Sequence, residues 1–292
     1  MVKRKILASQ ISNARSRNNE RQLEKELSKF FGRLHLQVQS NLEEYWNDDL
    51  VNGQVDLIIK PILDSHLEYY KVILKYVKRE YKLGQAEATR LVRLMNKGYA
   101  FKAEEADLNI SDRFNLFATL RGAEDDLLDR IFEASLGTLM RVDNSIKTIL
   151  LDGYKSGNGI NYVAGLLTRR FTQLQTWEAK RIARTEIHNS HNTAVMDTYQ
   201  ELDIEYTMWI SADDDRVRTY EKGDKADHRI LNGEIIRLGD TYSNGLRYPG
   251  DTDGPLVEWI NCRCSNAPFA IPYGYIAPPQ KQFKESDLIK IK

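Results

Sequence analysis

Apolar residues in the first half of the chain recur at the spacing of amphipathic helices. Leu23, Leu27, Phe30 and Leu34 follow one another at steps of four, three and four residues, which places their side chains on one helix face. Similar stripes return further along, and glycines separate them. The chain up to about residue 175 is therefore predicted to be mostly helical. The later stripes comprise Ile58, Ile62, Leu67, Tyr70, Ile73 and Val77, then Leu91 and Met95, then Leu127, Ile131, Leu139, Val142 and Ile146.

A different pattern begins after residue 200. Residues 205–210 and 234–238 are short β-type runs, and the Leu231-Asn232-Gly233 sequence before the second run is typical of a hairpin turn. Residues 257–262 form a third such run. The sequence therefore predicts an α+β fold, in which a long, mostly α-helical N-terminal region precedes a small C-terminal α+β module with short antiparallel strands. We expect the parts to be residues 1–154, residues 155–270 and an extended tail, residues 271–292.

Composition limits the class of protein. The 292 residues carry 42 Lys and Arg against 42 Asp and Glu, so the formal net charge is zero and a uniformly basic nucleic-acid coat is excluded. No apolar run approaches the ~18 residues of a membrane span, and no signal-peptide core follows the basic N-terminus. The two cysteines, Cys262 and Cys264, are too close in sequence for an unstrained disulfide. We therefore expect a reduced, intracellular, soluble protein without a membrane partner.

Charge is uneven near the N-terminus. The first 35 residues hold nine Lys or Arg against three Glu. One interpretation is an arm or helix face that contacts phosphates or an acidic partner. The other is a solvated helix face with Glu–Lys pairs, which the modest size of the excess favours. Under the first interpretation, the candidate nucleic-acid contacts are Lys3, Arg4, Lys5, Arg15, Arg17 and Arg21.

A dense polar cluster occupies residues 181–192. On a helix, Arg184, His188 and Asn192 share one face because they are four residues apart. The apolar side of this helix is interrupted, which is unusual for a simple core helix. Two interpretations stay open: a buried polar network or site, or a helix whose polar side chains cap neighbouring loops. The candidate network comprises Arg184, Thr185, Glu186, His188, Asn192, Asp213, Arg216, Asn261 and Arg263.

A metal site is the sharpest chemical candidate. Cys262 and Cys264 would point the same way on an extended segment, and His228 would supply a third donor. Tetrahedral zinc commonly takes cysteine sulfur and histidine nitrogen. The fourth ligand stays open among Asp213, Asp215, His188, His191 and water, and the set we favour is His228, Cys262, Cys264 and Asp215. The alternative is that the cysteines are ordinary buried thiols, and that the aspartates cap a helix and pair with Arg184.

Short motifs between residues 155 and 268 occur in an order that points to one family. The series runs Ser156-Gly157-Asn158-Gly159, Ile182-Ala183-Arg184-Thr185-Glu186, Asn192, Trp209, Asp215-Arg216-Val217, His228, Leu231-Asn232-Gly233, Tyr248-Pro249-Gly250-Asp251 and Asn261-Cys262-Arg263-Cys264. In this series the chain resembles the minor head protein family of tailed bacteriophages, typified by the phage Mu F protein. Residues 155–270 would then be a Mu F-like head morphogenesis module. Many relatives carry a cysteine near the position of Arg218 and a histidine near residues 258–260. This chain has neither, and both differences weaken the metal prediction.

The resemblance implies a virion morphogenesis protein that is not an enzyme. Such proteins are present in few copies inside the capsid, near the portal, after assembly in the host cytoplasm. The implied partners are the portal protein, scaffold or major capsid protein, and double-stranded DNA at packaging or ejection. The alternative that stays open is a metal-dependent hydrolase, either a nuclease or a toxin-like enzyme. It would gather Asp213, Asp215, His228 and both cysteines around one ion, with His188 or Glu186 as general base.

Overall fold

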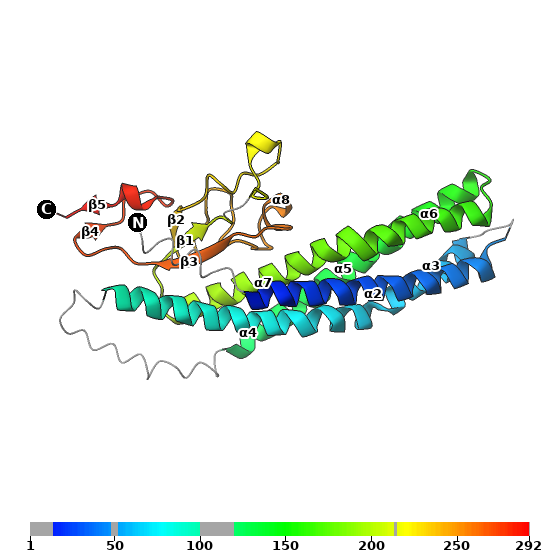
Figure 1. The fold of residues 1–292 in the computed structure, drawn as a ribbon, viewed down its shortest axis with the longest axis horizontal. Coiled ribbons are helices and arrows are strands. Elements are labelled where there is room, and N and C mark those ends of the chain that lie inside the picture. The colour runs from blue at the N-terminus through cyan, green and yellow to red at the C-terminus, as the bar shows by residue number, and fades with distance from the viewer. Residues whose placement is uncertain (1–13, 48–51, 100–119, 213–214, 292) are drawn as a thin grey trace. The chain divides into compact units, whose positions relative to one another are not determined.

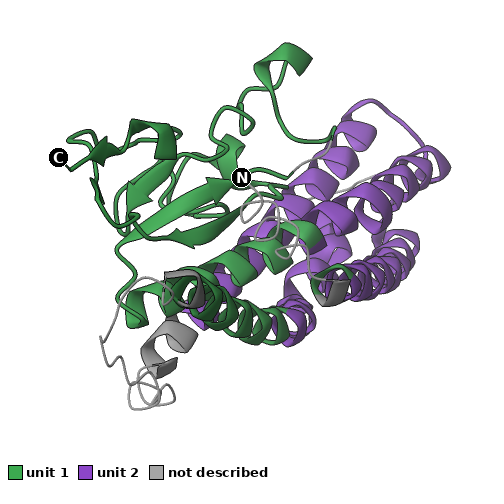
Figure 2. Ribbon diagram, turned by 60° about the vertical axis from the view of Figure 1, so that its left-hand side comes forward, with its two compact units in different colours: residues 1–17, 77–119, 184–292 green, residues 18–76, 120–183 purple. Residues whose placement is uncertain are grey.

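The computed structural model describes residues 14–47, 52–99, 120–212 and 215–291. Contacts group the chain into two compact units, each built from separate stretches of sequence (Figure 2). The helical unit comprises residues 18–76 and 120–183, and the mixed unit comprises residues 1–17, 77–119 and 184–292. This grouping by contacts is a different division from the sequence ranges 1–154, 155–270 and 271–292, which stay a prediction.

Long helices come first along the chain and short antiparallel strands follow, so the predicted α+β class is confirmed (Figure 1). The helices before the first strand are α2 (Ala14–Tyr45), α3 (Asn52–Asp64), α4 (His66–Tyr99), α5 (Leu120–Lys155), α6 (Ile160–Gln173), the π-helical turn η2 (Leu174–Glu178) and α7 (Ala179–Glu201). Within the described residues, every helix is too short or too polar to cross a bilayer.

The helical unit buries the predicted apolar stripe of α2. The four stripe residues of α2, from Leu23 to Leu34, are each at most 2% exposed. The stripe predicted across residues 58–77 is divided between two helices, because α3 ends at Asp64 and α4 begins at His66. The break lies at Ser65, whose hydroxyl donates to the Ile62 carbonyl.

In the mixed unit, α4 and α7 approach each other closely at a glycine. A Cβ on Gly84 would lie 2.5 Å from the carbonyl oxygen of His191 and 2.9 Å from Cβ of Ala194. A side chain at this position would hold the helices apart, so glycine is required for their packing. Beyond the crossing, the helices share an apolar cluster of Ala88, Val92, Val195, Met196, Tyr199 and Ile204.

The strands of the mixed unit form a three-stranded antiparallel sheet in the order β2-β1-β3. Thr207 in the central strand β1 (Tyr206–Ile210) is paired with Ile236 of β2 (Ile235–Arg237) and with Pro268 of β3 (Ser265–Phe269). The remaining elements are η3 (Tyr220–Lys222), α8 (Leu256–Trp259), β4 (Tyr275–Ile276), η4 (Glu285–Asp287) and β5 (Ile289–Lys290), and β4 pairs with β5.

Two of the three predicted strand runs are confirmed and the third is wrong. Runs 205–210 and 234–238 contain β1 and β2, whereas residues 257–262 contain most of α8 and a turn. Asn261 has a left-handed backbone with φ of 56°, which breaks any extended path before β3. The turn at Gly233, with φ of 80°, leads into β2, but the long loop 211–234 separates β1 from β2 in place of a tight hairpin.

The tail after residue 270 packs against the sheet of the mixed unit, and Phe283 is its buried anchor. Phe283 is 4% exposed and forms a β-bridge with Ile235, so the tail extends the sheet edge at β2. The Phe283 ring also meets Tyr206 edge to face, with ring centroids 5.8 Å apart. Burial of an aromatic side chain of this size holds the middle of the tail against the sheet.

Candidate metal centre

Loops of the mixed unit bring one histidine and both cysteines together. His228 lies in the loop between β1 and β2, Cys262 follows α8, and Cys264 directly precedes β3. The backbone of His228 is held on both sides, because its N–H donates to the Arg218 carbonyl (3.0 Å) and its carbonyl accepts the Ser211 hydroxyl. All three side chains are buried. Their positions therefore depend on the packing of the loops and not on local chain geometry.

Aromatic side chains pack against the imidazole of His228. The indole of Trp209 is fully buried and meets the His228 ring edge to face, with ring centroids 5.4 Å apart. Tyr242 packs against the same indole at 5.1 Å. Both cysteines belong to this apolar cluster. Close packing on one side limits the rotamers available to the donor side chains.

The donor atoms have the spacing of metal ligands. Nδ1 of His228 lies 3.6 Å from Sγ of Cys262 and 3.5 Å from Sγ of Cys264, and all three donors lie within 4.8 Å of one another. A tetrahedral zinc ion with ordinary bond lengths would place its nitrogen and sulfur ligands ~3.6 Å apart. The cluster could therefore bind a metal ion with little rearrangement.

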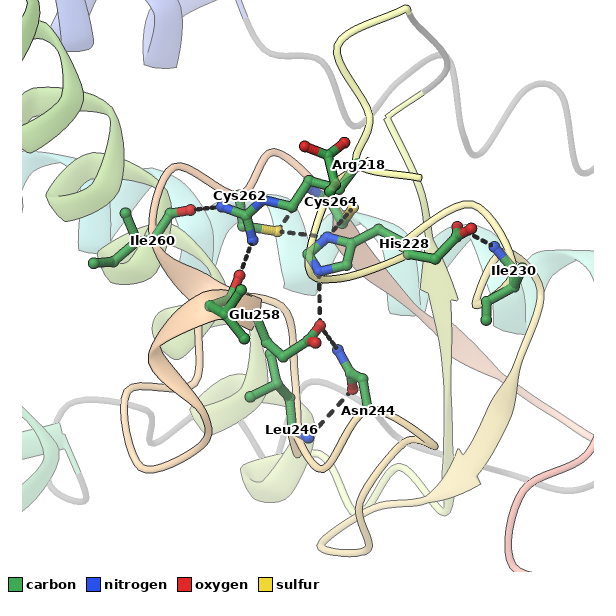
Figure 3. A network of polar contacts seen from close by, with 12 residues as sticks. Arg218, His228, Ile230, Asn244, Leu246, Glu258, Ile260, Cys262 and Cys264 are labelled. Carbon is green, nitrogen blue, oxygen red and sulfur yellow. Dashed lines mark hydrogen bonds and ion pairs between the residues drawn. The ribbon is translucent and has the colours of Figure 1, made fainter. Parts of the chain in front are cut away.

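A carboxylate orients the histidine from its other side. Nε2 of His228 lies 3.0 Å from Oε2 of Glu258, and the Asn244 side-chain amide donates to the same oxygen at 3.0 Å (Figure 3). Metal-binding histidines commonly donate their second ring N–H to a carboxylate, which fixes the tautomer. With the proton on Nε2, the lone pair of Nδ1 faces the two sulfur atoms.

The thiols and the imidazole share their protons unevenly. A hydrogen bond to Cys264, followed by burial, raises the pKa of Cys262 well above 9.0, whereas the Cys262 hydrogen bond holds the pKa of Cys264 well below that value. Burial lowers the pKa of His228, but the hydrogen bond and the charge interaction with Cys264, together with the Glu258 hydrogen bond, outweigh burial and leave the pKa above 6.5. Without an ion, Cys264 is therefore the more acidic of the two thiols. A bound cation would release the remaining protons.

A polar cavity of about 170 Å³ adjoins the three donors. Across it, the Arg218 guanidinium donates to the carbonyls of Val257 and Ile260, which ties the loop before His228 to α8. The cavity is lined by Ala212, Arg216, Val217, Arg218, Asp224, His228, Asn261, Cys262, Arg263 and Cys264.

The polar face of α7 positions the segment before the first cysteine. The Arg184 guanidinium donates to Oδ1 of Asn261 at 3.0 Å, and Oγ1 of Thr185 accepts the Asn261 backbone N–H at 3.1 Å. These bonds stabilise the left-handed backbone of Asn261, a conformation that asparagine tolerates better than most residues. The turn that aims Cys262 at His228 is therefore held by α7.

About two turns further along α7, Asn192 holds the second cysteine. Its amide nitrogen donates to the carbonyls of Cys264 (3.1 Å) and Pro249 (2.8 Å), and it lies 2.9 Å from Nε2 of His188. Burial holds the pKa of His188 down to about 3, so its imidazole stays neutral in this network. Asn192 thus joins two motifs that are separated in sequence.

The motif at residues 248–251 is a turn locked by an ion pair. The Arg247 guanidinium donates to both carboxylate oxygens of the buried Asp251, each at 2.8 Å. Burial raises the pKa of Asp251, but the bonds from Arg247 outweigh it and leave the pKa lowered. Gly250 has φ of 90°, and a Cβ there would lie 2.6 Å from Oδ1 of Asn189 on α7. Both the left-handed backbone and the close approach of Asn189 therefore require glycine at this position.

The structure leaves some predicted site residues outside the cluster. Asp215 is exposed, and its carboxylate is not among the three clustered donors. His191 faces elsewhere, with Nδ1 2.9 Å from Oε1 of the buried Glu80. Glu186 is half-buried on α7. Asp213 lies outside the described residues.

The structure describes the side chains of only two of the six basic residues proposed for nucleic-acid contact. Lys3, Arg4 and Lys5 lie outside the described residues, and so does the side chain of Arg15. The two described members, Arg17 and Arg21, are exposed on α2. Exposure is compatible with both interpretations of the basic excess.

Sequence reasoning missed the two polar residues behind the histidine. Glu258 contacts the His228 imidazole from 30 residues further along the chain, and Asn244 contacts Glu258 across a separation of 14 residues. No spacing rule links these positions, since each lies in irregular structure or a short helix. The one available signal was a carboxylate four residues before the first cysteine.

Comparison with known proteins finds no matching family model, no matching curated protein and no matching solved structure. The chemistry of the cluster therefore rests on its own geometry.

Proposed function

We propose that this chain is a head morphogenesis protein of a tailed phage, a minor capsid component that acts with the portal inside the capsid. The support is the ordered series of motifs in the sequence, together with the contacts among their members. Asn192 bonds to Pro249 and Cys264, and Thr185 bonds to Asn261. Motifs with a common architectural purpose are expected to contact one another in this way. That convergence carries the proposal.

We also propose that the cluster of His228, Cys262 and Cys264 holds zinc. Two sulfur donors and one imidazole suit zinc better than calcium or magnesium, which prefer oxygen. The Cys264 backbone N–H also lies 3.4 Å from Sγ of Cys262, a contact that stabilises a thiolate ligand. The carboxylate of Glu258 completes the usual carboxylate–histidine arrangement.

Zinc would act here mainly as a structural ion that ties two loops together, and we call this role the zinc clasp. In its described residues, the loop 211–234 has no regular structure apart from η3, and one bound ion would tie His228 in this loop to the segment that enters β3. Closing a loop through a metal removes conformational freedom from the unfolded chain, so the binding energy stabilises the fold. A rigid module would then present a defined surface to the portal.

The assembly role is tested in particles. Procapsids and virions from a phage or prophage carrying this gene are analysed by mass spectrometry, and the tagged chain is used to pull down the portal. A few copies per particle and recovery of portal protein are the expected results. Absence from both particle types would contradict the proposal, as would particles that assemble and package normally without the gene.

Contact with double-stranded DNA is a separate part of the proposal, and it rests on the basic residues 1–35. Replacing Lys3, Arg4, Lys5, Arg15, Arg17 and Arg21 with glutamine, which keeps the buried stripe of α2, is expected to weaken DNA retention in a salt-dependent way, because phosphate contacts release counterions. Equal retention with and without the substitutions would contradict it. The control replaces the tail lysines Lys281, Lys284 and Lys290 in the same way.

Zinc binding is tested by elemental analysis of the purified chain. One zinc per chain is expected, and the Cys262→Ser, Cys264→Ser double variant should lose it. A metal-dependent hydrolase is the second candidate, and the polar cavity next to the donors is the observation in its favour. Chelator-sensitive nuclease turnover would support the hydrolase, whereas stoichiometric zinc without turnover supports the clasp.

A further inference from the structure

One continuous helical stretch of the helical unit runs from Ile160 of α6 through the π-helical turn η2 to Ala183 of α7. Every residue in this stretch is described, and its exposed positions recur every three or four residues, so they form one stripe along the helix. None of the exposed residues of this stretch is acidic. We call them the basic stripe, and they comprise Asn161, Tyr162, Gly165, Thr168, Arg169, Thr172, Gln173, Thr176, Trp177, Lys180 and Arg181.

The basic stripe carries three positive charges, those of Arg169, Lys180 and Arg181. Among the described residues, no carboxylate forms an ion pair with any of the three. The one acidic residue between Ile160 and Ala183 is Glu178, which is half-buried and forms an ion pair with Arg170. The charge on the stripe is therefore available to a partner outside the chain.

The π-helical turn brings the two arginines of the stripe to the same side. The Ala179 N–H donates to the Leu174 carbonyl five residues back, so this turn holds one residue more than an α-helical turn. Arg169 and Arg181 are twelve positions apart, which on a regular α-helix would separate them by about 120° around the axis. The extra residue reduces this separation to about 20°. The irregular turn thus gives the stripe a single charged direction.

An exposed tryptophan orders one of these cations. The Arg181 guanidinium lies over the indole of Trp177, 4.7 Å from the ring centroid, and 51% of the tryptophan is exposed. A guanidinium stacked by its face presents its N–H groups at the edge, where they can bind phosphate oxygens in pairs. The exposed residues next to the tryptophan are threonine, glutamine and lysine, so the stripe lacks the broad apolar centre of a protein–protein interface.

A fourth positive side chain extends the charged face onto α5. Arg141 is exposed and donates to the neutral hydroxyl of Thr138 at 2.9 Å. Ser145, one turn later on the same face of α5, accepts a hydrogen bond from Nε of Arg170 at 2.9 Å, so this face of α5 lies against α6. The positive charge therefore continues across two neighbouring helices of one unit.

We propose that the basic stripe binds the phosphate backbone of double-stranded DNA. From Arg169 to Arg181 the helix rises about 17 Å, a length along which a duplex presents about ten phosphates. A straight row of cations without acidic residues between them complements such a rod of negative charge. Backbone contacts read no bases, so the binding is independent of sequence. This inference goes beyond the proposed function, because it uses none of residues 1–35 and does not require the assembly role.

The salt dependence of DNA binding by the full-length chain tests the inference. The probe is a short fluorescein-labelled duplex of mixed sequence, and its affinity is measured by anisotropy at several salt concentrations. In the Arg169→Gln, Lys180→Gln, Arg181→Gln variant, the slope of log affinity against log salt should fall by about 0.9 for each lost phosphate contact. Arg181→Gln alone should lower it by about 0.9, with the least change to the fold.

The matched control removes the same number of charges from two other helices of the helical unit. It replaces Lys60 of α3 with Lys71 and Lys75 of α4 by glutamine, and all three lysines are exposed. The net charge changes equally, so the control should keep the wild-type slope if binding depends on the stripe. A second comparison keeps the charge: Arg169→Lys with Arg181→Lys should also retain the slope. Circular dichroism checks the fold of each variant.

The outcomes distinguish this inference from the proposals above. An unchanged slope in the folded triple variant and in Arg181→Gln would overturn it, and so would an equal fall in the lysine control. Stripe-dependent binding of poly-glutamate with unaltered DNA binding would identify an acidic polypeptide as the partner and would also overturn it. A fall that persists when the basic side chains of residues 1–35 are replaced by glutamine would support a separate DNA contact. Absence of the chain from phage particles would contradict the assembly role and leave this inference intact.

Discussion

Removing the charge of Glu258 is the most informative perturbation of the candidate centre. Oε2 of this carboxylate lies 3.0 Å from Nε2 of His228 and accepts the Asn244 amide at 3.0 Å. In Glu258→Gln, the side-chain oxygen can still accept both hydrogen bonds, so the geometry survives and the charge is lost. In Glu258→Ala, both bonds are lost, and the imidazole is free to change its tautomer.

The expected magnitude follows from these bonds. A hydrogen bond to a charged group contributes about 1.5–3 kcal/mol and a neutral one about 0.5–1.5 kcal/mol. The glutamine variant should therefore weaken zinc binding by about 1.4 kcal/mol, which is roughly tenfold. The alanine variant should approach the upper end of the 10–100-fold range that is typical for such outer partners.

The assay is competition for zinc against a chromophoric chelator at about pH 8, where protons compete with zinc for the thiolates less than at neutral pH. Glu221→Gln is the matched control, because Glu221 is an exposed carboxylate in η3 of the same loop. Circular dichroism of each apo-protein checks that the fold is retained. An affinity unchanged in both Glu258 variants would refute the idea that this carboxylate orients the histidine for metal binding.

Three further predictions follow from other contacts. The Cys262→Ser, Cys264→Ser variant should melt at a lower temperature than wild type when zinc is present, and a chelator should abolish the difference; identical melting curves in zinc would contradict the clasp. Gly84→Ala should destabilise the chain by about 1–3 kcal/mol in urea unfolding, because its Cβ would clash with a backbone oxygen. The control Gly165→Ala, which meets nothing within 4 Å on α6, should instead stabilise by about 0.5–1 kcal/mol, and similar signs for the two would refute the packing argument. Asp251 has a lowered pKa in the folded state, so its contribution is present above the unfolded pKa of about 3.9 and is lost as pH falls through the folded value. Thermal melts should show Asp251→Asn less stable than wild type at neutral pH, with the difference shrinking in acid; a pH-independent difference would count against the ion pair.

The candidate site was predictable only in part. The C-x-C spacing and the single histidine nearby indicated a metal site, and the polar face of α7 indicated a network. Asp215 was assigned to the site because it follows a strand in the sequence, yet its backbone carbonyl contacts Lys222 and its side chain is exposed. Glu258 was noted in the sequence only as a departure from a family pattern, although it supports the histidine directly.

The amino-acid sequence alone determined the parts of this protein whose geometry is local. A 3.6-residue period places Leu23 and Leu27 on one face wherever the helix goes, and the β-type run at residues 205–210 marks the position of β1, although its pairing partners β2 and β3 are distant in sequence. Tertiary structure alone decided which loops meet, because a loop has no period that fixes its direction. His228 reaches Cys264 across 36 residues through the packing of Trp209 and the bonds of α7 to Asn261. These contacts depend on the closure of the whole unit, and no stretch of sequence contains that information locally.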